Sequence, residues 1–163
     1  MEIQMKVRWS YGVRVITIVV SLLLLFAEYE ILSIFDKRNW LIIFCSLLVL
    51  LIFAYCISNS PVYVKLSDSE LVFKKVIGRI TIPYSEVKKV EVFKPEFENV
   101  RLFGSGGFWS YTGLFSNKDI GKYNSYVGDP DQAFLIQLNN GKNYAFSCEN
   151  RDFVVDAIEK YIS

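Results

Sequence analysis

Residues 40–58 read WLIIFCSLLVLLIFAYCIS and include no charged side chain. A helix rises about 1.5 Å per residue, so this segment would form a helix roughly 28 Å long, close to the hydrocarbon thickness of a bilayer. Each Leu, Ile, Phe and Val in it favours insertion by about 0.3 to 0.6 kcal/mol, and no charge opposes them. The segment therefore predicts a membrane-spanning helix, and the chain after Ser58 is the part that this helix anchors.

Residues 11–32 form a second apolar segment, whose uncharged centre ends at Ala27. Its basic start and short centre also fit a secretory signal peptide, but no convincing cleavage site follows Ala27. A second spanning helix fits better, with Arg14 reaching one interface and Glu28 and Glu30 near the other. We interpret these charges as interfacial anchors. The alternative is a proton or ion pathway, which is difficult to build from only two spans.

A short polar connection at residues 36–39 joins the two segments, which predicts an antiparallel hairpin with both chain ends on one side of the membrane. Lys37 and Arg38 are the basic residues of this connection. More basic residues flank the other ends of the hairpin: Lys6, Arg8, Arg14, Lys65, Lys74 and Lys75. The positive-inside rule therefore places both termini and the following domain on the cytoplasmic side of the inner or plasma membrane.

The composition limits what the carried domain can do. The chain divides into residues 1–59, an N-terminal tail with the hairpin, and residues 60–163, which suffice for one small domain. A net charge of +1 provides no field for holding nucleic acid. The absence of histidine removes the commonest general base and metal ligand. Since Cys45 and Cys56 lie in the apolar run, Cys148 is alone in the domain, and we expect no disulfide framework, metal or cofactor.

Alternating apolar residues predict a series of strands after the hairpin. Period-two patterns occur at residues 62–66, 71–74, 80–82 and 90–92, with turns too short for helical crossovers. They predict an antiparallel meander.

The end of the chain predicts a tight hairpin followed by a helix. Strands at 134–138 and 144–146 flank Asn140-Gly141, and acidic and capping residues at 149–152 open the helix. One apolar stripe of this helix is expected to cover the sheet, and its members are Phe153, Val154, Ala157, Ile158, Tyr161 and Ile162.

Residues 101–126, RLFGSGGFWSYTGLFSNKDIGKYNSY, contain five of the nine glycines of the chain, interleaved with aromatic residues. Glycine permits positive φ and close backbone approach, and the aromatic rings supply area to bury or to present. A phosphate-binding loop is the alternative, but Trp109 occupies the last position of a GxGxxG pattern and no Lys-Ser/Thr pair follows. The block predicts bulged strand corners with core aromatics.

Several motifs in this order resemble the bacterial pleckstrin-homology-like (PH) family, in particular its small membrane-anchored members. The motifs are IPYSEV at 82–87, GLF at 113–115, GKY at 121–123, the Asn140-Gly141 hairpin and SCEN at 147–150. The resemblance covers residues 61–162. It implies a membrane-anchored α+β protein in which a two-helix hairpin precedes an antiparallel β-sandwich or partly open barrel, capped by a C-terminal helix. It also implies binding rather than catalysis, and supplies no catalytic residue.

Two binding functions compete. In the first, the domain is a membrane-tethered interaction module for a membrane or cytoplasmic protein, and its partner surface is formed by Phe108, Trp109, Tyr111 and Phe115. In the second, it senses anionic lipid through Lys74, Lys75 and Arg79. Lipid-binding PH domains cluster basic residues near the first strand turn, but residues 68–70 read DSE here, which argues against specific phosphoinositide recognition.

An enzyme is the third and least favoured possibility. Its candidate acids are Asp119, Asp129 and Asp131, which fall in predicted loops beside Gly128 and Pro130. Turn formation explains acidic residues in such places without any catalytic role.

Overall fold

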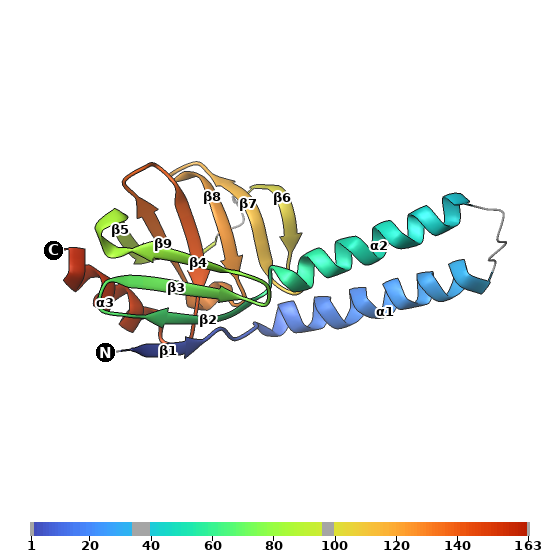
Figure 1. Ribbon diagram of the computed structural model, residues 1–163, viewed down its shortest axis with the longest axis horizontal. Helices are drawn as coiled ribbons and strands as arrows, with labels where there is room; N and C mark the ends of the chain where they lie inside the picture. Colours follow the sequence, from blue (N-terminus) through green and yellow to red (C-terminus); the bar gives the residue numbers. More distant parts are fainter. Residues whose placement is uncertain (1, 34–39, 96–99, 163) are drawn as a thin grey trace.

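The computed structural model describes residues 2–33, 40–95 and 100–162. Figure 1 shows two parts: a β-rich domain and a pair of antiparallel helices that project from one end of it. The helices are α1 (Tyr11–Ser33) and α2 (Trp40–Ser58), where the apolar segments predicted them. Both are long and apolar enough to cross a membrane, and α2 has no buried residue. The predicted polar connection at 36–39 lies outside the described residues.

The first sheet has four antiparallel strands in the order β1-β2-β3-β4. Its members are β1 (Ile3–Lys6), β2 (Pro61–Leu66), β3 (Glu70–Lys75) and β4 (Arg79–Pro83). The sequence did not predict β1, which pairs with β2 from Ile3 opposite Leu66 to Lys6 opposite Tyr63. The sheet therefore joins the chain before α1 to the chain after α2.

The second sheet has six strands in the order β5-β9-β10-β8-β7-β6. They are β5 (Val87–Val92), β6 (Val100–Gly106), β7 (Tyr111–Asn117), β8 (Gly121–Val127), β9 (Ala133–Leu138) and β10 (Asn143–Ser147). The sheet is mixed, because β10 runs parallel to β8, with Tyr144 opposite Asn124. The meander predicted for residues 62–92 is confirmed for β2, β3 and β4, but its last strand, β5, pairs with β9 in this second sheet. The β9–β10 hairpin lies between β5 and β8, so the chain leaving β8 passes β10 before it enters β9. The two sheets form no closed barrel, and β6 is one edge of the larger sheet.

Side chains of both sheets meet in one core, which includes Leu71, Phe73, Phe134 and Phe146. The predicted C-terminal helix is α3 (Arg151–Ile162), and it covers this core with Val154, Val155 and Ile158. The predicted stripe was wrong at Phe153, which is exposed, and it omitted Val155, which is buried. Tyr161 is also largely exposed, although its ring stacks on that of Tyr84. The helix is therefore turned about its axis relative to the predicted face.

Candidate functional site

Backbone hydrogen bonds join both helices directly to the β domain. Only two residues separate α2 from β2. The N–H groups of Ile77 and Val76, in the turn between β3 and β4, donate to the carbonyls of Ser58 at 2.9 Å and Ser60 at 3.0 Å. On the α1 side, the N–H of Ser10 donates to the carbonyl of Gly128 at 3.0 Å. The hairpin therefore continues into the domain without a flexible linker, and we call this region the junction.

Aromatic residues of the turn between β6 and β7 fill the junction. The ring of Trp109 meets that of Trp9 at a centroid distance of 5.3 Å and that of Phe53, on α2, at 6.1 Å. The neighbouring Phe108 ring also meets Phe53, at 5.6 Å. The backbone N–H of Trp109 donates to Oγ1 of Thr17 on α1 at 2.9 Å. This turn therefore contacts both helices at once.

The predicted partner surface is distributed over three environments. Phe108 and Trp109 are half-buried at the junction. Tyr111 is half-buried at the start of β7, and its carbonyl accepts from Oγ of Ser125 at 2.8 Å. Phe115 is buried and stacks on Tyr123. The fold thus brings Phe108 and Trp109 together and separates them from Phe115, and a role in partner binding stays a prediction.

Two glycines explain how β6 and β7 come together beside the junction. Gly104 and Gly113 are directly opposite each other, with φ angles of +115° and +135°. A Cβ on Gly104 would collide with the carbonyl oxygen of Thr112, and one on Gly113 with that of Phe103. Only glycine combines a positive φ with the absence of a Cβ that would clash with the facing strand. The register also shifts between Arg101 and Phe103, so the predicted bulge in this block is confirmed.

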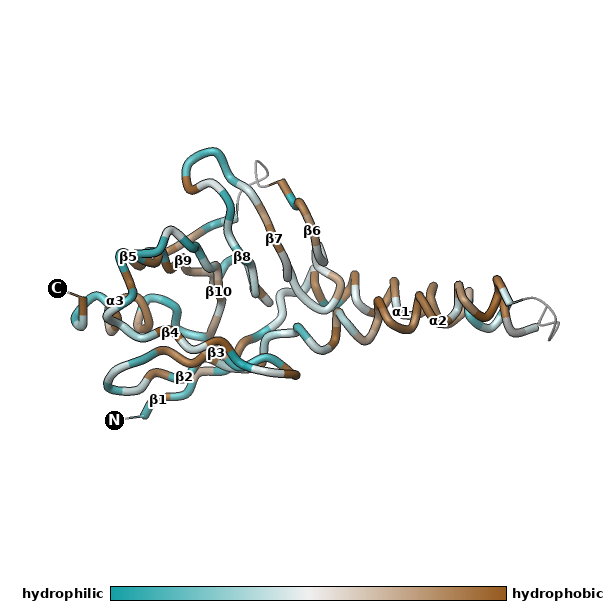
Figure 2. The backbone as a smooth tube through the Cα atoms, turned by 45° about the horizontal axis from the view of Figure 1, so that its top comes forward, coloured by the Kyte–Doolittle hydropathy of each residue, from teal (hydrophilic) through white to brown (hydrophobic). Residues whose placement is uncertain are grey.

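The side of the domain nearest the helices carries exposed apolar side chains. We call them the apolar rim, and they are Val76, Ile77, Val100, Leu102 and Phe103. The first two lie in the turn after β3, which Figure 2 shows as a hydrophobic tip on the side from which the helices leave. The other three belong to β6, where the ring of Phe103 lies 6.2 Å from that of Tyr55 on α2. Sequence analysis missed this set, although an apolar Val-Ile pair in a turn was a visible clue.

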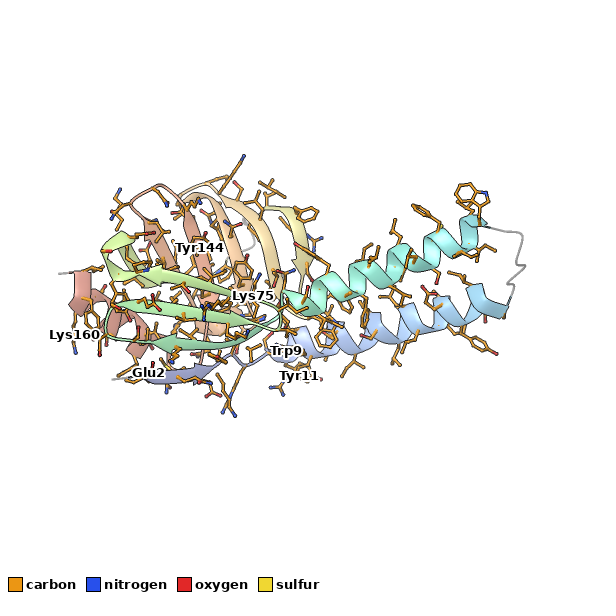
Figure 3. The ribbon with its side chains drawn as sticks, viewed as in Figure 1. Glu2, Trp9, Tyr11, Lys75, Tyr144 and Lys160 are labelled. Atoms are coloured by element: carbon orange, nitrogen blue, oxygen red, sulfur yellow. The ribbon has the colours of Figure 1, made fainter. Side chains whose placement is uncertain are left out.

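The predicted lipid contacts lie on the two strands that flank this turn. Lys74 on β3 is directly opposite Arg79 on β4. Lys75 has an internal role, because its Nζ donates to Oδ1 of Asn59 at 3.0 Å and lies 5.3 Å from the centre of the Tyr126 ring. Figure 3 shows Lys75 on the same side of the domain as Trp9, where the hairpin begins. Lys74 and Arg79 are therefore close to the junction, and Lys75 is part of it.

A polar pocket of about 420 Å³ includes Asp129, one of the acids considered for catalysis. Asp129 accepts from the N–H of Asp131 at 3.1 Å, which is a turn role. Arg8 and Glu149, which both line the pocket, form an ion pair.

The Cys148 thiol beside this pocket is a poor nucleophile at neutral pH. Burial is the main cause that raises its pKa to about 12, and the charge of Glu149 adds to the effect. Among the described residues, no cluster of three or more His, Cys, Asp or Glu could hold a metal ion.

A polar contact also joins the two helices of the hairpin. Oγ of Ser46 on α2 donates to Oε2 of Glu28 on α1 at 2.5 Å. Glu28 thus faces the second helix, whereas Arg14 and Glu30 are exposed. The sequence reasoning treated Glu28 as an interfacial anchor and did not pair it with Ser46.

Comparison with known proteins identifies the domain. The family model described as "Bacterial PH domain" matches residues 62–162. An uncharacterized protein of Clostridium acetobutylicum is 32% identical over 106 residues, which cover 65% of this chain and 33% of that protein. The chain thus spans about a third of the length of this relative. No solved structure matches the chain. The order of strands and final helix agrees with the sequence match, and the chain belongs to the bacterial PH domain family.

Proposed function

We propose that this protein is a non-catalytic binding module that α1 and α2 tether to the cytoplasmic face of the membrane. It would act there through protein–protein interaction or regulation. The observation that carries this proposal is the pairing of β1 with β2 across the hairpin.

The β1–β2 pair supports a hairpin that crosses the membrane twice. β1 precedes α1 and β2 follows α2, and their residues are hydrogen-bonded neighbours in one sheet. Both ends of the hairpin must therefore be on the same side of any bilayer that it spans. The basic residues around these ends favour the cytoplasmic side.

Binding fits the domain better than catalysis does. PH domains of the matched family are generally binding modules. The chain has no histidine, Asp129 of the polar pocket shapes a turn, and the side chain of Cys148 is buried in the core. These features support a module that positions a partner at the membrane surface.

Membrane insertion and sidedness can be tested with the full-length protein. Two variants, Lys37→Cys between the helices and Lys142→Cys in the β9–β10 turn, are made after replacement of Cys45 and Cys56 by Ala. Each has one accessible cysteine, because the remaining Cys148 is only 1% exposed. A membrane-impermeant maleimide should label position 37 in intact spheroplasts and position 142 only after permeabilisation. Alkaline carbonate should leave both variants in the membrane. Release by carbonate, or the opposite labelling pattern, would contradict the proposal.

Partner binding requires a separate test. Full-length protein is crosslinked mildly in its native membranes and extracted, and the co-purifying proteins are quantified. We expect a stoichiometric partner that the Trp109→Ala/Tyr111→Ala variant loses while it keeps its far-UV circular dichroism spectrum. Phe153→Ala, which alters an exposed ring on α3, is the matched control and should retain the partner. Recovery of the protein alone would argue against an interaction module.

Contact with anionic lipid is the second candidate function. It is favoured by the bonds that hold the β3–β4 turn to the end of α2, because Lys74 and Arg79 flank that turn. Basic residues near an anionic surface contribute about 1 kcal/mol each. The Lys74→Ala/Arg79→Ala variant should retain less phosphatidylglycerol during purification than wild type, and Lys142→Ala should not differ from wild type. Equal retention in all three proteins would exclude this role.

A further inference from the structure

We propose that the apolar rim enters the interfacial layer of the same bilayer that the hairpin spans. The domain would then rest on lipid, with Ile77 and Phe103 among the headgroups, and would not stand in water above the membrane. This inference rests on the proposed membrane tethering and adds to it a lipid-contacting surface on the β domain.

The first part of the argument is the position of the β3–β4 turn. Ile77 donates its N–H to the carbonyl of Ser58, which is the last residue of α2. The turn is therefore level with the end of the spanning helix. Ile77 is nevertheless 68% exposed, and Val76 beside it is exposed as well. Apolar side chains at this level are in contact with lipid headgroups and the upper acyl chains if the helix spans the bilayer.

The second part is the position of β6. Phe103 is 65% exposed, and its ring contacts Tyr55, which precedes the end of α2 by three residues. Three residues correspond to about 4.5 Å along a helix. Phe103 is therefore beside a part of α2 that would already be within the membrane, and tyrosine is a residue typical of the interface.

The orientation of β6 extends this contact. In Figure 1, β6 runs across the direction of the hairpin at the side from which α1 and α2 leave the domain. Its exposed apolar residues, Val100 and Leu102, thus belong to the edge of the domain nearest the membrane.

Dimensions and charge both favour lipid as the occupant. α2 has 19 residues, so it is roughly 28 Å long, which is about the thickness of the hydrocarbon core and no more. A headgroup layer of about 5 to 7 Å then remains on each side, and the rim lies at that level. Lys74 and Arg79 flank the turn with positive charge, which suits anionic headgroups. The rim also meets the exposed surface of α2, where Phe103 contacts Tyr55.

The test measures the depth of single labelled positions in the full-length protein. Cys45 and Cys56 are replaced by Ala, and Cys148 is kept because it is only 1% exposed. The fluorophore NBD is attached to Ile77→Cys, Phe103→Cys or Phe153→Cys, and the protein is reconstituted in vesicles of phosphatidylcholine and phosphatidylglycerol. Phe153 is the matched control, because it is an exposed phenylalanine on α3, at the end of the domain opposite to the hairpin (Figure 1). The parent protein without an introduced cysteine measures background labelling.

We expect nitroxide-labelled lipids to quench the fluorophore at positions 77 and 103 at least three times more strongly than at position 153. Aqueous iodide should show the reverse order. Equal iodide quenching at all three positions, in protein that resists carbonate extraction, would show that the apolar rim does not enter the bilayer. The proposal that the helices tether the protein to the membrane would then still stand. Release by carbonate would overturn the tether itself. Strong disulfide crosslinking through position 103 without lipid quenching would instead assign the rim to a second copy of the chain, and would also overturn this inference.

Discussion

The ring of Trp109 meets the ring of Trp9 edge-on, at a centroid distance of 5.3 Å and an interplanar angle of 83°. Trp9 precedes α1, and Trp109 lies between β6 and β7. The pair therefore joins the start of the hairpin to the β6 edge of the larger sheet, and Phe53 of α2 belongs to the same cluster.

Replacing Trp109 by Ala should destabilise the domain and loosen it from the helices. A fully buried Trp→Ala change costs about 3 to 5 kcal/mol, and we expect about 2 kcal/mol here because Trp109 is half-buried. Urea unfolding of full-length protein in detergent, followed by circular dichroism, measures this cost. Trp40→Ala is the control, because Trp40 is 73% exposed at the far end of α2, and its cost should stay below about 0.5 kcal/mol. Equal effects of the two variants would contradict a structural role for the tryptophan pair.

Alanine at Gly104 or Gly113 should disrupt the pairing of β6 with β7. Both residues have positive φ, and at both a Cβ would strike a backbone carbonyl that cannot move aside. Gly121 also has positive φ, at +71°, but a Cβ there meets no atom within 4 Å. Gly121→Ala should therefore lower the free energy of unfolding by about 1 kcal/mol, which is the cost of the backbone conformation alone. Gly104→Ala and Gly113→Ala should each lower it by at least twice that amount. Thermal unfolding of the three variants side by side measures the difference, and similar midpoints would show that the close approach of the strands is unimportant.

Alkaline pH should destabilise the domain through buried groups. Burial is the main cause that raises the pKa of Cys148 from 9.0 to about 12 and that of Tyr84 from 10.0 to about 12. Above about pH 9 the unfolded chain loses the thiol proton while the folded chain keeps it. The contribution of this thiol to the free energy of unfolding is therefore constant below about pH 9 and falls between about pH 9 and 12. Cys148→Ala should delay the onset toward pH 10, where tyrosine begins to titrate in the unfolded chain. Urea titrations at several pH values test this, and an unchanged onset in the variant would contradict it.

The contact between Glu28 and Ser46 should couple α1 to α2 weakly. Interhelical hydrogen bonds in membranes average about 0.6 kcal/mol and reach about 1.7 kcal/mol. We expect a coupling energy within this range from a double-mutant cycle of Glu28→Ala and Ser46→Ala, measured by unfolding in mixed micelles. A parallel cycle with Glu30→Ala, which alters an exposed acid on the same helix, should give a coupling near zero. Equal coupling in the two cycles would show that the Glu28 contact is not specific.

Hydropathy and alternation were sufficient to predict the helices and most strands. The segment at 40–58 is apolar throughout, and β3 alternates the buried Leu71 and Phe73 with partly buried neighbours. β9 is instead an apolar run that is buried at nearly every position. β1 could not be predicted in this way, because it has only four residues and a single buried side chain, Met5. Its partner β2 is also more than fifty residues away, so no local pattern links them.

The candidate site was less predictable because its residues acquire their roles from tertiary contacts. The aromatic block was recognised as unusual, yet the sequence could not show that Trp109 would contact Trp9 and Phe53. Similarly, the sequence patterns did not single out Val76 and Ile77. Only the bonds from this turn to the end of α2 show where the pair lies relative to the helices.

The pairing of β1 with β2 also has a consequence for biosynthesis. β1 is translated before α1, but its neighbour β2 is translated only after the complete hairpin. If the hairpin spans the membrane, a nascent chain that inserts one helix and not the other leaves β1 and β2 in different compartments. Such a chain exposes the edge of β2 to chaperones and proteases, whereas a correctly inserted chain covers it. The N-terminal strand thus makes completion of the fold conditional on completed insertion.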